Sequence, residues 1–220
     1  MGALLDDFFA QPNKVGNGRT LSAHLTSPQK VEVEESQRLI CEYGCTRTLE
    51  IGLALGASAV GIAEISNGTR HVALDPFQHD FDNIGLNEIK RLGLADKFEF
   101  VPERSEDYLH RCAVLGSTFD FIFIDGYHTI GQKVTDVFLA DKCLEPGGIV
   151  AIHDAFIPAS VYAVEYLQTE LGYHVLPLKA DAKWKLPARM VRYGKRHGLR
   201  FAREVVPYVC RSVVALRKPR

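Results

Sequence analysis

Residues 119–131 read FDFIFIDGYHTIG, and this stretch decides the fold. Phe119–Ile124 mixes aromatic and aliphatic residues in the manner of a buried strand, and Asp-Gly-Tyr-His follows it directly. A strand that ends in this way lifts the carboxylate of Asp125, and three residues later the imidazole of His128, out of an apolar sheet. The pair indicates a functional edge of that sheet.

On either side of this strand, short β-rich runs alternate with amphipathic helical runs from about residue 46 to 178. This alternation is the signature of an α/β protein with a parallel sheet. Residues 30–42 predict an additional N-terminal helix. The expected strands are Arg47–Ile51, His71–Leu74, Phe98–Val101, Phe119–Ile124, Ile149–His153, Tyr173–Leu176 and Ser212–Leu216.

The composition suits one large soluble domain, since 46% of the 220 residues are hydrophobic and 24% are charged. We expect a helical extension over 1–45 and a main domain over 46–220, with a basic insertion at about 179–210. No signal peptide or membrane-spanning run is recognisable. The five cysteines form no Cys-x-x-Cys pair, which predicts reduced thiols in a cytoplasmic protein.

Ligands of such sheets bind beyond the carboxyl ends of the strands. The first strand ends in TLEIGLALGAS, where Gly52 and Gly56 allow a tight turn and a helix begins near Ser58. The second strand ends at Asp75, placed to accept hydrogen bonds from the hydroxyls of a ribose. The alternative is that Asp75 is only a turn residue before a proline.

These features fit either NAD or S-adenosylmethionine. The turn reads Glu50-x-Gly52-x-x-x-Gly56 and lacks the G-x-G-x-x-G spacing that cradles a pyrophosphate, which favours S-adenosylmethionine. After the third strand, Ser105 is a candidate to flank an adenine, although it could equally cap the next helix.

The fifth strand ends at His153-Asp154. If the fourth and fifth strands are neighbours, their ends lie about 5 Å apart, and Asp125 and Asp154 could converge on one cation. Two unpaired carboxylates at that distance would repel, and a divalent metal removes the conflict. Oxygen ligands favour Mg²⁺ or Ca²⁺, and His153 as a third ligand would favour Mn²⁺ or Fe²⁺. Adjacent strand residues point to opposite faces, so His153 and Asp154 need a local bend to share a metal. The alternative is that these acids only cap helices or bond to loops.

The combination resembles the class I S-adenosylmethionine-dependent methyltransferases, and is most similar to the small O-methyltransferase-like group with Ile-Asp-Gly-x-His at the fourth strand. The stretches that carry the resemblance are LEIGLALGAS, ALDPF, FIFIDGYHTIGQKVTDVFLADKCLEPGG and IVAIHD. It implies a Rossmann-like, doubly wound, seven-stranded and mostly parallel sheet with helices on both faces and an antiparallel last strand.

The resemblance also implies roles for single residues. Asp125 and Asp154 match metal-binding positions of metal-dependent members such as sugar and macrolide O-methyltransferases, and His128 matches their general base. This chain has His153 where those enzymes tend to carry an acid. The residues expected to contact the cofactor are Glu50, Gly52, Gly56, Ser58, Asp75, Ser105 and Asp125.

The chemistry implied is methyl transfer to a hydroxyl oxygen of a small acceptor, with His128 taking the proton and Asp125 beside it. The lack of a proline after Asp125 argues against amino-group methyltransferases, which commonly read Asn/Asp-Pro-Pro-Tyr there. Two alternatives stay open: a metal-independent enzyme acting on nitrogen or RNA, and a nucleotide-binding module or NAD-dependent oxidoreductase.

Residues 179–220 hold 13 of the 26 Lys and Arg of the chain but only two acidic residues. This segment is either a solvated helical insertion or a docking surface for an anionic acceptor, such as a phosphorylated sugar. No RNA-binding motif accompanies the charge, which disfavours a nucleic-acid partner. Together with the N-terminal helix, the segment is a candidate contact surface of a homo-oligomer.

Overall fold

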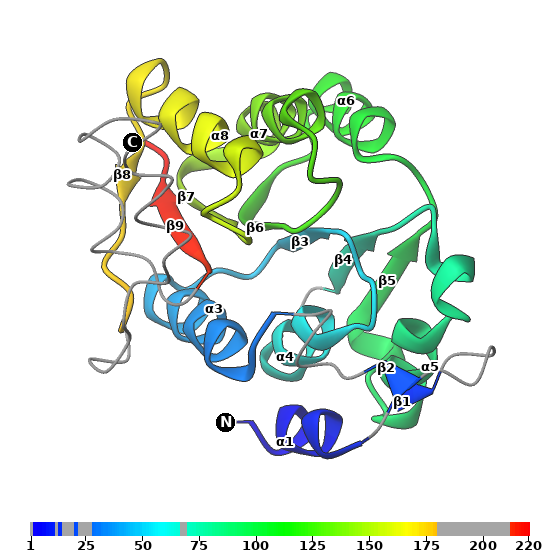
Figure 1. The fold of residues 1–220 in the computed structure, drawn as a ribbon. Coiled ribbons are helices and arrows are strands. Elements are labelled where there is room, and N and C mark those ends of the chain that lie inside the picture. Colours follow the sequence, from blue (N-terminus) through cyan, green and yellow to red (C-terminus); the bar gives the residue numbers. More distant parts are fainter. Residues whose placement is uncertain (1, 12, 15–19, 22–27, 67–69, 180–211) are drawn as a thin grey trace. The chain divides into compact units, whose positions relative to one another are not determined.

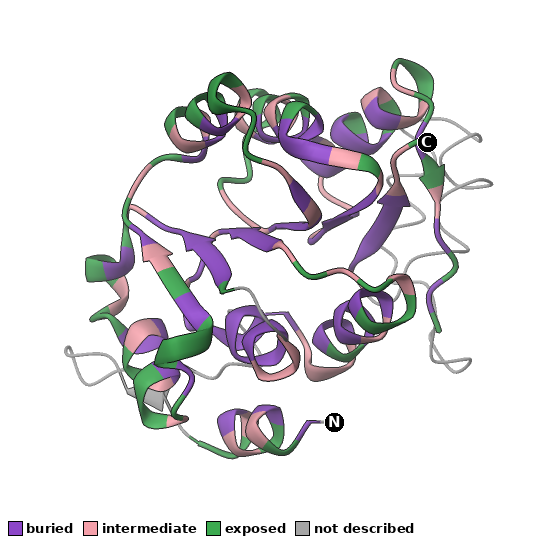
Figure 2. Ribbon diagram, turned by 180° about the vertical axis from the view of Figure 1, so that it is seen from behind, coloured by how far each residue is buried: buried purple, intermediate pink, exposed green. Residues whose placement is uncertain are grey.

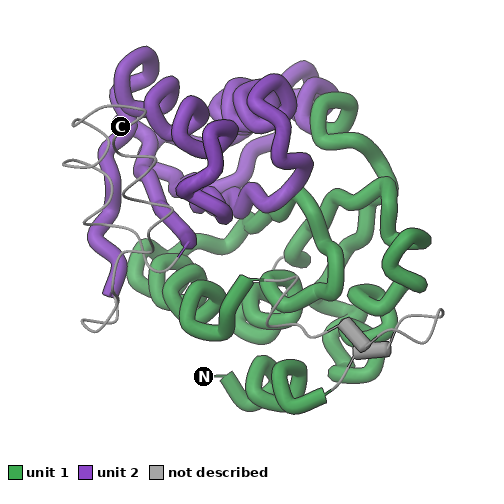
Figure 3. The backbone as a smooth tube through the Cα atoms, in the orientation of Figure 1, with its two compact units in different colours: residues 1–108 green, residues 109–220 purple. Residues whose placement is uncertain are grey.

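A computed structural model of the chain describes residues 2–11, 13–14, 20–21, 28–66, 70–179 and 212–220. The residues group into two compact units, unit 1 over Met1–Tyr108 and unit 2 over Leu109–Arg220 (Figure 3). The boundary predicted after residue 45 falls inside unit 1. The predicted basic insertion lies outside the described residues except for Lys179.

The strand order β5-β4-β3-β6-β7-β9-β8 confirms the predicted seven-stranded α/β fold (Figure 1). Strand β9 runs antiparallel to its neighbours β7 and β8, whereas the pairings of β3 with β4, β4 with β5 and β6 with β7 are parallel. The predicted antiparallel last strand is therefore confirmed. Among the described residues, no helix is both long and apolar enough to cross a membrane.

Unit 1 contains three parallel strands, β3 (Thr48–Ile51), β4 (His71–Leu74) and β5 (Phe98–Val101). A separate pair of two-residue strands, β1 (Asn13–Lys14) and β2 (Thr20–Leu21), is antiparallel. The helices of the unit are α1 (Ala3–Ala10), α3 (Lys30–Tyr43), α4 (Ala57–Ile65), α5 (Ile84–Arg91), the short 3₁₀ turns η1 (Gln78–Phe81) and η2 (Ala95–Lys97), and the first turn of α6 (Ser105–Leu115).

Helix α4 is the centre of packing in unit 1, because α1 and α3 both lie against it. The side chains of Leu5, Phe8 and Val33 are buried in one hydrophobic cluster with the apolar residues of α4. Gly61 is the point of closest approach, since a Cβ atom there would overlap Val33 Cγ1. A small residue at 61 therefore lets α3 seat on α4.

We expect Gly61→Ala to lower the free energy of unfolding by about 1–3 kcal/mol, the usual cost of overpacking a core. The intrinsic gain in helix propensity is too small to offset this overlap. Urea denaturation of the variant measures the loss.

A matched control is Gly131→Ala near the start of α7, where no atom lies within 4 Å of the added Cβ. That variant should be unchanged or slightly stabilised. Val33→Ala removes the overlapping methyl group, so adding it to Gly61→Ala should cost less than the two single losses summed. Strict additivity would show that the overlap is not the cause.

Unit 2 is built on β6 (Phe119–Ile124), β7 (Leu144–Ile152), β8 (His174–Val175) and β9 (Val214–Arg217). Its helices are α7 (Ile130–Cys143) and α8 (Pro158–Thr169), which pack against each other, and α7 also packs on β6 and β7. Strands β6 and β7 are buried along most of their length (Figure 2). Burial of this kind explains their near-continuous apolar sequence.

The register of β6 and β7 positions the residues that follow them. Ile124 is paired with Ile152, the last residue of β7. Because the two strands are parallel, Asp125 and His153 leave the sheet at the same level. The prediction that the fourth and fifth strands are adjacent in the sheet is thus confirmed.

Candidate active site

The glycine turn after β3 has the tight geometry that its sequence predicted. Gly52 and Gly56 have φ angles of 94° and 91°, and Ala54 between them has a φ of 44°. Gly56 precedes the first residue of α4, and a Cβ on it would lie 3.1 Å from the Cα of Gly85. The turn therefore needs glycine at 56 both for its backbone angle and for its contact with α5.

The carboxylate of Asp75 stabilises this turn through hydrogen bonds. Its Oδ2 accepts hydrogen bonds from the backbone N–H groups of Leu53 (3.2 Å) and Ala54 (3.0 Å) and from Gln78 Nε2 (2.9 Å). Its Oδ1 accepts one, from the backbone N–H of Phe77 at 2.8 Å. Oδ1 is therefore the oxygen with remaining capacity for a ligand hydroxyl, since each carboxylate oxygen has about two lone-pair sites.

Glu50 lies in the middle of β3 and is fully buried. No described residue donates a hydrogen bond to either of its carboxylate oxygens. The Nε2 atom of His71 lies 3.5 Å from its Oε2. A buried carboxylate without a donor is costly, so this position suits a ligand that brings N–H groups.

The two serines predicted at the cofactor both lie in first turns of helices. Ser58 is the second residue of α4 and is buried. Ser105 is the first residue of α6, and its hydroxyl donates to Glu106 Oε2 at 3.4 Å. Their contacts with a cofactor stay a prediction.

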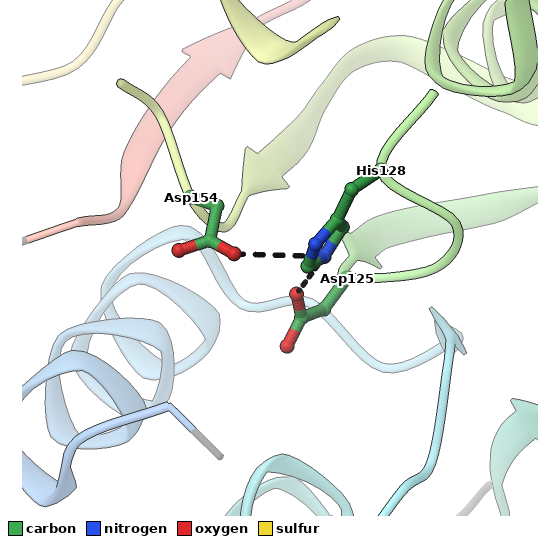
Figure 4. Close-up of side chains that lie close together, drawn as sticks. All are labelled: Asp125, His128 and Asp154. Carbon is green, nitrogen blue, oxygen red and sulfur yellow. Dashed lines mark ion pairs between the residues drawn. The ribbon is translucent and has the colours of Figure 1, made fainter. Parts of the chain in front are cut away.

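In unit 2, Asp125, His128 and Asp154 converge, and one ligand atom from each lies within 4.8 Å of the others (Figure 4). His128 Nε2 is 3.6 Å from Asp125 Oδ1 and 3.5 Å from Asp154 Oδ2. The chain reaches Asp154 through a bend, as the sequence required, because its φ is 52°. Among the described residues, this is the group with the spacing of a metal site.

His153, which the sequence placed among the metal ligands, lies beside both carboxylates, and its role as a ligand stays a prediction. Its Nδ1 lies 3.0 Å from Asp125 Oδ1, and its Nε2 lies 3.1 Å from the hydroxyl of Ser212 at the start of the last strand segment. Both ring nitrogens therefore have protein partners. His128 is the second imidazole between the two carboxylates, with its Nε2 within 3.6 Å of an oxygen of each.

The charge of Asp125 is balanced from within unit 2. Burial alone would raise the pKa of this carboxyl, but the positive charge of His153, hydrogen bonds from His128 and His153, and the charge of Lys133 hold the pKa well below its usual range. Asp125 is accordingly an anion at neutral pH. In this ionised form the carboxylate can bind a metal ion or stabilise a positive charge that develops beside it.

Lys133 is a functional candidate that the sequence analysis missed. Its side chain is fully buried, and its Nζ donates to the backbone carbonyl of Ile124 at 3.2 Å. Burial lowers the pKa of its ammonium group, while Asp125, Asp136 and Asp154 act in the opposite direction. The available signal was helical spacing, because Lys133 is in phase with the buried Val137 and Ala140 of α7.

Comparison with known proteins shows a likeness to methyltransferases. Residues 49–155 match the family model of a methyltransferase domain. Catechol O-methyltransferase B of Danio rerio is 29% identical over 151 residues, which cover 66% of this chain and 56% of that protein. The alignment thus spans little more than half of that relative's length.

Two solved structures share the fold. The O-methyltransferase TomG from Streptomyces achromogenes, in complex with SAM, has a TM-score of 0.62 at 16% identity over 99% of this chain and 90% of that one. An O-methyltransferase from Bacillus cereus, in complex with SAH, has a TM-score of 0.57 at 18% identity over 99% of this chain and 91% of that one. At such identities the likeness shows the fold alone.

Proposed function

We propose that this chain, which carries a methyltransferase domain of the class I fold, transfers a methyl group from S-adenosylmethionine to a hydroxyl oxygen of a small acceptor. The observation that carries the choice of oxygen is the convergence of His128 with the carboxylates of Asp125 and Asp154. An alcohol is a poor nucleophile while it keeps its proton, and this group can remove the proton.

Unit 1 has the features that the cofactor needs. The buried carboxylate of Glu50 has no donor from the described residues and fits the ammonium group of the methionine end. The N-terminus of α4 behind Gly56 suits the carboxylate of that end. Asp75 Oδ1 can accept a hydrogen bond from a ribose hydroxyl, while Oδ2 remains engaged with the turn.

Unit 2 has the features of a divalent cation site. Asp125 and Asp154 offer oxygen ligands, which suit Mg²⁺ or Mn²⁺, and the low pKa of Asp125 keeps one of them charged. The donor set therefore fits the ion. A bound cation would lower the pKa of an acceptor hydroxyl.

The residues of the chain transfer the proton and position the reacting groups. His128 accepts the proton of the acceptor hydroxyl, and Asp154 Oδ2, 3.5 Å from its Nε2, stabilises the imidazolium that results. His153, which also bonds to Ser212, holds Asp125 in place. S-adenosylmethionine supplies, when bound, the activated methyl group.

The acceptor that we propose is small and anionic or sugar-containing, on the strength of the basic composition of residues 179–220. We place the protein in the cytoplasm. The four described cysteines, Cys41, Cys45, Cys112 and Cys143, are not joined in disulfides, which supports a reducing compartment.

Ligand-induced stabilisation tests the choice of cofactor. S-adenosylhomocysteine at about 100 times its Kd should stabilise the protein by about 2.7 kcal/mol, whereas NAD at the same concentration should leave the melting temperature unchanged. A differential scanning fluorimetry titration measures both. Stabilisation by NAD and not by S-adenosylhomocysteine would instead favour the oxidoreductase.

A further inference from the structure

Three polar side chains form a buried row in unit 1. Thr48 and Glu50 lie two residues apart on β3, and His71 is the first residue of the neighbouring strand β4. Their exposed fractions are 2%, 0% and 0%. Neither the predicted cofactor site nor the methyltransferase motifs account for His71.

The strand register places the three on one face of the sheet. Leu49 is in register with Val72, so the residues that precede them, Thr48 and His71, are also level. Side chains alternate along a strand, and Glu50 therefore points to the same side as Thr48. The Thr48 hydroxyl lies 2.9 Å from His71 Nδ1, and His71 Nε2 lies 3.5 Å from Glu50 Oε2.

The polar atoms of this row differ in whether they have a hydrogen-bond partner. Thr48 and His71 Nδ1 bond to each other, whereas His71 Nε2 and both oxygens of Glu50 have no hydrogen-bond partner among the described residues. Burying such groups without partners costs free energy, so a row of this kind persists only where a partner arrives or a function requires it.

The Thr48–His71 contact is compatible with two tautomers of the imidazole, and one of them places an N–H group opposite Glu50. A threonine hydroxyl can donate to an imidazole nitrogen, and a neutral imidazole that accepts at Nδ1 carries its proton on Nε2. That Nε2–H group then faces Oε2 of Glu50. The other oxygen, Oε1, is left for a donor from outside the row.

We propose that His71 is the positioning residue of Glu50: with its tautomer set by Thr48, its Nε2–H group forms a hydrogen bond to Oε2 when the methyl donor binds, and Oε1 receives the ammonium group of the donor. This inference rests on the proposed function. His71 does not touch the cofactor in this scheme and acts only through Glu50. Its effect should therefore be confined to ligands that carry the amino-acid end.

The test compares two ligands and two variants by isothermal titration calorimetry. The ligands are S-adenosylhomocysteine and 5′-methylthioadenosine, which keeps the adenosine and the thioether but lacks the amino-acid end. His71→Gln retains an N–H donor near the position of Nε2, whereas His71→Leu has a similar size and no donor.

We expect His71→Leu to weaken S-adenosylhomocysteine binding by about 10–100-fold, the range for a hydrogen bond to a charged group, and to leave 5′-methylthioadenosine binding within about twofold. His71→Gln should recover most of the lost affinity. If His71 has a purely structural role, His71→Leu should lower the affinity for both ligands alike, and that result would overturn the inference.

The outcomes separate the inference from the proposed function. If the unmodified protein binds neither ligand, the proposed function itself fails. If it binds both and His71→Leu changes neither affinity, the function stands and the role of His71 is wrong. If His71→Leu does not fold, the isosteric Thr48→Val replaces it in the test, because it removes only the hydroxyl that sets the tautomer. This variant should show the same selective loss of S-adenosylhomocysteine affinity.

Discussion

Replacing His128 with glutamine should lower kcat by about 10²–10⁴-fold, the contribution typical of a general base. His128 is half exposed and its Nε2 lies between two carboxylate oxygens, at 3.6 and 3.5 Å, so it can both take a proton and be stabilised once charged. Glutamine keeps a similar size and a polar end but cannot accept the proton. Single-turnover rates with an accepted substrate measure the loss.

The affinity for S-adenosylhomocysteine should stay within about twofold, because the proposed role of His128 concerns the acceptor and not the cofactor. Tyr127→Phe is the matched control: it changes the exposed neighbour of His128 and should leave kcat unaltered. An unchanged kcat in His128→Gln would remove the base from the proposal. A loss of Mn²⁺ affinity in the same variant would make His128 a metal ligand.

The strand ends could be predicted from the sequence because their placement depends on backbone alone. The run Phe119–Ile124 and the apolar run before His153 both predict buried parallel strands, and parallel strands end at the same level. The pairing of Ile124 with Ile152 then brings the residues after them together. No side-chain partner has to be known for this step.

The partners of the polar side chains could not be predicted in the same way. Asp75 was expected to hold a ribose, yet the backbone N–H groups of Leu53 and Ala54 already use its Oδ2. Hydrogen bonds of this kind depend on the path of a turn, which two glycines permit but do not specify. The ribose contact therefore reduces to a proposal for Oδ1.

His153 likewise has a hydrogen-bond partner that the sequence could not predict. The sequence placed it next to Asp154 and so among the ligands, and in the structure its Nδ1 lies 3.0 Å from Asp125 Oδ1 and 3.8 Å from Asp154 Oδ1. Its second partner, Ser212, is 59 residues away in the chain, and no local pattern announces such a contact. Long-range pairing of this sort needs the fold itself.

Asp125→Asn should weaken Mn²⁺ binding by at least about 10–100-fold, a loss already seen when groups that only support a metal ligand are removed. The pKa of Asp125 lies well below its usual range, so the unmodified residue offers a full negative charge and the amide offers none. Titration of free Mn²⁺ by electron paramagnetic resonance measures the affinity without any acceptor. Activity with and without EDTA measures the consequence for turnover.

Asp154→Asn removes the second carboxylate and should have an effect of the same order, whereas Asp96→Asn, an exposed acid in η2, should have none. Because Asp154 is less buried than Asp125, its variant also guards against a loss caused by misfolding. If the unmodified protein binds no Mn²⁺ and EDTA leaves turnover intact, the metal is excluded. The charge of Asp125 is then balanced by the protein itself, through Lys133 and His153.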